Sequence, residues 1–67
     1  MKKLNKVGEM RIKKGYSIGQ LARMSGMAKS TIIRIENYEV DTTQSQMRRI
    51  SRALNRKVWE VFDLSWL

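Results

Sequence analysis

The chain has 67 residues, enough for one small domain, so we expect residues 1–67 to form a single domain. It contains no cysteine and no histidine, which excludes disulfide scaffolds, zinc fingers, and thiolate or imidazole catalysis. Fourteen Lys and Arg residues against six Asp and Glu give a formal net charge of +8, which favours a polyanionic partner such as nucleic acid.

The first helix is expected from about Lys3 to Lys14. Four residues at helical spacing fall on one face: the apolar Leu4, Val7 and Met10, and the charged Arg11. Gly15 follows and is placed to end the helix in the left-handed conformation. Gly8, inside this helix, weakens it by about 1 kcal/mol relative to alanine.

The second helix is expected from about Ile18 to Ser25. Ser17 is a good N-cap, and Gln20 stands three residues later, which completes the pattern of a capping box. Gly26 permits the positive φ that a tight helix exit needs. Gly19 is a local weakness in this helix.

The third helix is expected from about Lys29 to Asn37. Ala28 occupies its N-cap position and cannot cap it with a side chain. Apolar residues of the second and third helices face inward, and Met27 fills the angle between them; the inward residues are Leu21, Ala22, Ile32 and Ile35. Residues 17–37 therefore have the pattern of a helix-turn-helix, whose second helix usually enters the major groove of DNA.

The remaining elements are a loop and two further helices. Tyr38 to Thr42 is expected as the loop. Thr43, with Gln46 at the capping-box position, begins a helix from about Gln44 to Leu54, whose buried stripe is Met47, Ile50, Ala53 and Leu54. Asn55 ends it as a left-handed residue, a short helix follows from about Val58 to Phe62, and residues 63–67 form an apolar tail. Strands are not expected, since β-branched alternation is scarce.

This pattern resembles the lambda repressor and Cro type of helix-turn-helix regulator, also called the XRE family. The resemblance covers about residues 4–62 without a gap and is carried by Arg11, Gly15, Tyr16, Ser17, Leu21, Ala22, Gly26, Met27, Ile32, Ile35, Glu36, Asn37, Ile50, Ala53 and Leu54. It implies an all-α fold: a compact five-helix domain that binds operator DNA, usually as a dimer. It also implies an internal ion pair between Arg11 and Glu36.

The resemblance assigns base contacts to the start and outer face of the third helix: Ala28, Lys29, Ser30, Ile33 and Arg34. Arg34 and Lys29 can bind guanine O6 and N7, and Ile33 can touch a thymine methyl group. Two alternatives remain. In the first, Lys29 and Arg34 contact phosphates and no bases. In the second, Ile33 extends the core and contacts no base. Phosphate contacts are expected from residues that flank this helix, namely Ser17, Asn37, Tyr38, Thr42, Thr43 and Lys13.

The chain departs from the family pattern at four positions. Ile18 stands where the family often has a phosphate-binding Gln, and Ala28 replaces a capping Ser or Thr. Glu39 and Asp41 lie in a loop that is commonly basic, and their carboxylates would repel phosphates. These departures favour an alternative, a protein-interaction module with weak or no independent DNA binding. A further alternative is a controller or antitoxin-like protein on the same fold, which would bind an additional protein partner through the apolar tail.

A homodimer is expected, held by an apolar patch near the C-terminus: Trp59, Leu64, Trp66 and Leu67. The expected partner is double-stranded DNA. No cofactor, metal, small-molecule ligand or enzymatic activity is expected. We expect no membrane segment, because no apolar run approaches roughly 20 residues, and no signal peptide. We therefore expect a cytoplasmic, nucleoid-associated regulator.

Overall fold

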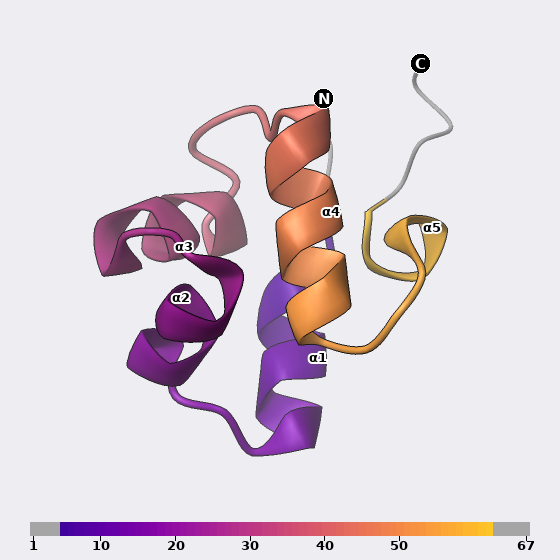
Figure 1. Cartoon of the computed structure of the whole chain (residues 1–67). Coiled ribbons are helices and arrows are strands. Elements are labelled where there is room, and N and C mark those ends of the chain that lie inside the picture. Colours follow the sequence, from indigo (N-terminus) through magenta and orange to yellow (C-terminus); the bar gives the residue numbers. More distant parts are fainter. Residues whose placement is uncertain (1–4, 63–67) are drawn as a thin grey trace.

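The computed structural model of the chain describes residues 5–62 (Figure 1). This part of the chain contains helices α1 (Val7–Lys14), α2 (Ile18–Ser25), α3 (Lys29–Glu36), α4 (Gln44–Ala53) and α5 (Val58–Val61). The described residues contain no strand, only an isolated antiparallel bridge between Asn5 and Phe62. The predicted all-α fold of five helices is therefore confirmed.

The core lies between α2, α3 and α4, and α1 and α5 close it. In Figure 1, α4 stands between α3 on one side and α5 on the other. The fully or nearly buried apolar side chains come from every helix and from Phe62: Val7, Leu21, Ala22, Ile32, Ile35, Met47, Ile50, Leu54, Val61 and Phe62. Met27 is partly buried against this cluster, in the angle between α2 and α3. The inward residues predicted for the helix-turn-helix are thus the residues that form the centre of the core.

Capping boxes begin α2 and α4, as their sequences predicted. The Ser17 hydroxyl accepts from the backbone N–H of Gln20 (3.0 Å), and the Gln20 side chain accepts from the backbone N–H of Ser17 (2.7 Å). Thr43 and Gln46 make the same reciprocal pair at 3.1 and 3.0 Å. α3 begins at Ala28 without a side-chain cap, also as predicted.

The predicted start of α1 is wrong. The helix begins at Val7 and not at Lys3, because Asn5 and Lys6 make other hydrogen bonds. The Lys6 N–H donates to the Val61 carbonyl (2.7 Å), and the Asn5 side chain accepts from the Val7 N–H (2.9 Å). Leu4, expected on the inward face, lies outside the described residues.

Three predicted helix ends are one residue too long. α3 ends at Glu36 and α4 at Ala53, so Asn37 and Leu54 are the residues after the last turn. α5 ends at Val61, because Phe62 is extended (φ −115°, ψ 133°) and bridges Asn5. Asn55 has φ 57°, the left-handed conformation that was predicted. No helix within residues 5–62 has the length and apolar character needed to cross a bilayer.

Gly26 provides a direct test of the turn. Its φ is 70°, and a Cβ added there would meet no atom within 4 Å, so Gly26→Ala should cost roughly 1–2 kcal/mol of unfolding free energy through backbone conformation alone. Gly19→Ala is the matched control, since Gly19 is helical and its added Cβ would make only ordinary contacts, the nearest at 3.8 Å. Urea unfolding of both variants should show a lower free energy of unfolding for Gly26→Ala and no decrease for Gly19→Ala. Equal stabilities would contradict the turn geometry.

Candidate nucleic-acid interface

The turn between α2 and α3 is closed by backbone hydrogen bonds. The Gly26 N–H donates to the Arg23 carbonyl (3.2 Å) and the Met27 N–H to the Ala22 carbonyl (2.9 Å). Ser25 is buried, yet its hydroxyl donates to carbonyls of its own helix, with the Leu21 oxygen at 2.8 Å. The Gly26 and Met27 N–H groups and the buried Ser25 hydroxyl are therefore all paired within the turn and α2.

Helix α3 has one buried face and one exposed face. Ile32 and Ile35 are fully buried on the inner face. The residues predicted to contact bases are all exposed on the outer side, from the N-cap onward: Ala28, Lys29, Ser30, Ile33 and Arg34. Ile33 is 39% exposed and does not belong to the core, so the alternative that it extends the core is wrong. The outer face thus carries two cations, a hydroxyl and an apolar side chain that are accessible to a partner.

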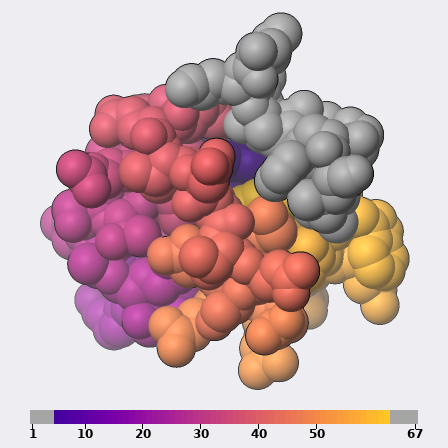
Figure 2. All heavy atoms as spheres, turned by 90° about the horizontal axis from the view of Figure 1, so that it is seen from above, coloured from indigo at the N-terminus to yellow at the C-terminus, as the bar shows by residue number. Residues whose placement is uncertain are grey.

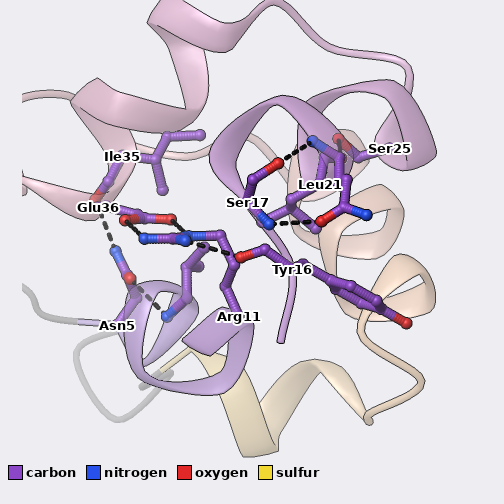
Figure 3. Close-up of polar contacts among 10 residues, drawn as sticks. Asn5, Arg11, Tyr16, Ser17, Leu21, Ser25, Ile35 and Glu36 are labelled. Carbon is purple, nitrogen blue, oxygen red and sulfur yellow. Dashed lines mark hydrogen bonds and ion pairs between the residues drawn. The ribbon is translucent and has the colours of Figure 1, made fainter. Parts of the chain in front are cut away.

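An ion pair connects the far end of α3 to α1 (Figure 3). Arg11 Nε lies 2.7 Å from Glu36 Oε2, and Arg11 Nη2 lies 3.2 Å from Glu36 Oε1, so the guanidinium donates a hydrogen bond to each carboxylate oxygen. The two side chains are only 15% and 12% exposed. The structure therefore contains the ion pair that the family resemblance implies, in a partly desolvated, bidentate form.

Arg11 also holds the chain that enters α2. Its Nη1 donates to the Tyr16 carbonyl (2.8 Å), immediately before the N-cap Ser17. On the other side of the pair, the Asn5 side chain donates to the Ile35 carbonyl at the end of α3 (2.9 Å) (Figure 3). One guanidinium thus links α1, the C-terminal end of α3 and the N-terminal end of α2.

Two glycines that the sequence predicted to weaken their helices lie beside functional side chains, and one of them, Gly8, makes room for its neighbour. A Cβ on Gly8 would lie 3.1 Å from Glu36 Oε1, so glycine lets the carboxylate approach α1 closely. A Cβ on Gly19 would lie 3.8 Å from Lys29 Cδ, so the Lys29 side chain extends over the start of α2. Neither neighbour is close in sequence, and no local pattern predicted these contacts.

The start of α2 retains donors for a phosphate. Its capping box occupies the Ser17 and Gln20 N–H groups, which leaves the N–H groups of Ile18 and Gly19 without an intrahelical partner. The Ser17 hydroxyl accepts one bond and keeps its proton for donation. The Lys29 side chain lies beside these groups, which together have the chemistry of an anion site.

The other predicted phosphate contacts lie outside this cluster. Asn37 and Tyr38 follow α3 directly and are exposed; Tyr38 adopts φ 60°, and its hydroxyl lies 3.5 Å from the Asn5 carbonyl oxygen. Thr43 is exposed at the start of α4, Thr42 is half-buried, and Lys13 is exposed on α1. The loop carboxylates of Glu39 and Asp41 are exposed beside Tyr38.

Comparison with known proteins agrees with this geometry. The structure has two packed helices joined by a closed turn, and the second helix has an outward polar face. The helix-turn-helix family model matches residues 7–58, most of the chain. The chain belongs to this family. This helix-turn-helix protein is of the lambda repressor and Cro type, as the residue pattern indicated, and such proteins are DNA-binding regulators.

Solved structures agree with this membership. This helix-turn-helix protein is similar to the restriction-modification controller protein C.AhdI from Aeromonas hydrophila, with 25% sequence identity, a TM-score of 0.80, and coverage of 82% of this chain and 83% of the other. It also has the fold of the hypothetical transcription factor NHTF from Neisseria, with 21% identity, a TM-score of 0.77, and coverage of 91% and 71%. No curated protein matches the chain.

The ion pair predicts a specific cost. Glu36→Gln keeps the size of the side chain but leaves the Arg11 guanidinium partly buried without its counter-charge, and it should lower the free energy of unfolding by roughly 3 kcal/mol. Glu39→Gln is the matched control, because it removes an exposed carboxylate and should change stability by less than about 0.5 kcal/mol. Urea unfolding measures both. Similar small losses would show that the pair does not hold α1 and α3 together.

Proposed function

We propose that the chain is a transcriptional regulator that binds a specific operator by inserting α3 into the major groove. The observation that carries this proposal is the exposure of Lys29, Ser30 and Arg34 on a helix whose other face is fully buried. A rigid helix with accessible cations and a hydroxyl is suited to base edges, and the adjoining start of α2 is suited to a phosphate. The net charge of +8 supports attraction to the duplex.

The proposed roles divide along α3. Arg34 and Lys29 contact guanine, Ser30 donates to or accepts from a base, and Ile33 and the Ala28 methyl group face thymine methyl groups. Phosphates are bound on the flanks by the residues proposed from the family pattern, which are Ser17, Asn37, Tyr38, Thr42, Thr43 and Lys13. Lys29 passes over the start of α2, so it also reaches the phosphate bound there.

We further propose that the chain acts as a homodimer on a palindromic operator, in the cytoplasm. Trp59 supports this proposal because its side chain is 69% exposed, which is unusual for so large an apolar group unless a partner covers it. The other members proposed for the patch, Leu64, Trp66 and Leu67, lie outside the described residues. Two copies of α3 would then meet successive major grooves about 34 Å apart.

A controller-type or partner-binding role is the second candidate. Its support is the likeness to a protein named a restriction-modification controller, together with the exposed carboxylates of Glu39 and Asp41 in the loop after α3. Under this alternative the fold serves mainly a protein partner. Duplex binding would then be weak and would show little preference for any sequence.

Selection of bound duplexes from a random pool tests the base contact of Arg34. With the selected duplex and its single-base variants, Arg34→Ala should lose discrimination at one base pair by roughly 1–3 kcal/mol. Arg56→Ala removes the same charge from the segment between α4 and α5, outside the proposed operator contact, and should lower affinity slightly without changing the preferred base. A uniform loss for Arg34→Ala across all duplexes would make it a phosphate contact. Failure to select any sequence would favour the partner-binding alternative.

Sedimentation equilibrium tests the dimer patch. Trp59→Ala and Trp66→Ala should each weaken self-association by roughly 2 kcal/mol or more, the scale of an interface hot spot. Ile12→Ala serves as the control, since Ile12 is 68% exposed on α1 and outside the proposed patch. An association constant that is equal in all variants would contradict the patch.

A further inference from the structure

A basic hollow of about 650 Å³ lies between α4 and α5. We call it the α4–α5 hollow and define it by its principal lining residues: Arg48, Ser51, Arg52, Arg56, Lys57 and Trp59. It lies apart from the outer face of α3 and plays no part in the proposed contact with the operator. Its size is that of a site for several side chains or a small ligand.

The charges of this hollow are not balanced by the rest of the described chain. Four of its lining residues are cations, and Glu60 is the single carboxylate that lines it. One Glu60 oxygen already accepts from the Lys57 backbone N–H (2.8 Å). Within residues 5–62 none of the four cations forms an ion pair. Like charges gathered in one concavity raise the local positive potential and favour an anionic partner.

Two further features equip the hollow for a ligand with both polar and apolar groups. Ser51 is 2% exposed, and its hydroxyl has no hydrogen-bond partner among the described residues, although buried polar groups are normally paired. Trp59 is largely exposed, and the Lys57 ammonium lies 5.7 Å from the centroid of its ring. A partner therefore meets guanidinium groups and an exposed indole surface in one place, while the Ser51 hydroxyl lies buried in the lining.

The hollow lies on the side of α4 that faces away from α3. In Figures 1 and 2, which are turned by 90° from each other, α3 lies on one side of α4 and α5 on the other. Arg48 and Arg52 are four residues apart on α4, so they form one row along the helix, about 6 Å apart. Arg56 follows after the left-handed turn at Asn55.

We propose that the α4–α5 hollow binds an acidic segment of a partner protein. Its carboxylates pair with the row formed by Arg48, Arg52 and Arg56, and an apolar side chain packs on Trp59. The spacing of about 6 Å between Arg48 and Arg52 matches carboxylates one helical turn apart or at alternate positions of a strand. A second copy of this chain is a poorer occupant of the arginine row, because it would bring the same four cations to the contact.

This proposal has a regulatory consequence. Trp59 also belongs to the patch proposed for self-association, so an acidic partner and a second copy compete for one side chain. The arginine row belongs to the acidic partner alone. Variants of the arginines therefore test this inference without removing a residue on which the proposed operator contact or the dimer depends.

The experiment uses the full chain and a fluorescein-labelled peptide in which Glu alternates with Leu. Fluorescence anisotropy at physiological ionic strength should show saturable binding that is lost with the analogue in which Gln replaces every Glu. The variant Arg52→Gln/Arg56→Gln should bind the acidic peptide roughly tenfold more weakly, since each of the two exposed ion pairs that are lost is worth about threefold. The matched variant Lys14→Gln/Arg23→Gln removes the same charge from exposed positions on α1 and α2 and should change the affinity for the peptide less than about twofold.

Three results would overturn the proposal. Equal losses in the two variants would show that only the net charge attracts the peptide. If the Arg52→Gln/Arg56→Gln variant loses more affinity for a single-stranded oligonucleotide than for the peptide, the hollow is a nucleic-acid site. A fall in self-association without a change in peptide affinity would assign the arginine row to a second copy. Affinity for the selected duplex should be equal in the two variants, so failure of this inference is distinguishable from failure of the proposed function.

Discussion

The contact of Arg11 with Glu36 is the interaction on which the arrangement of the interface depends. The guanidinium binds the carboxylate at the end of α3 and also the Tyr16 carbonyl at the entrance to α2. Buried ion pairs are often no more stabilising than apolar replacements, so the important consequence of this one is geometric. It fixes the outer face of α3 relative to the start of α2, which are the two surfaces proposed to meet bases and a phosphate.

Helix α3 has two roles that its periodicity separates. Ile32 and Ile35 are fully buried and hold the helix in the core, while Lys29 and Arg34 project from the opposite side. A helix anchored in this way loses little conformational entropy on binding DNA, because its backbone is already ordered. The same core is small, so the closed turn at Gly26 and the capping boxes of α2 and α4 supply order that a larger domain would obtain from burial.

Local chemistry made most of the fold predictable. Capping residues such as Ser17 and left-handed residues such as Asn55 gave the order and approximate bounds of the helices, because they act within a few residues. The wrong prediction for the start of α1 depends on a distant partner. The helix starts at Val7 because the Lys6 N–H donates to the Val61 carbonyl. The outer face of α3 followed from periodicity, but the space that Gly8 provides for the ion pair, and the gathering of cations between α4 and α5, arise only from tertiary packing.

The most direct test of the central claim is the amide spectrum of the ¹⁵N-labelled chain with and without its selected duplex. If α3 is the reading helix, the largest chemical-shift changes will fall at residues 28–34 and at the start of α2. The amides of Arg48 and Arg52, which line the α4–α5 hollow and belong neither to the proposed operator contact nor to the dimer patch, will change little. Large changes confined to α4 and α5, with residues 28–34 unaffected, would contradict the account.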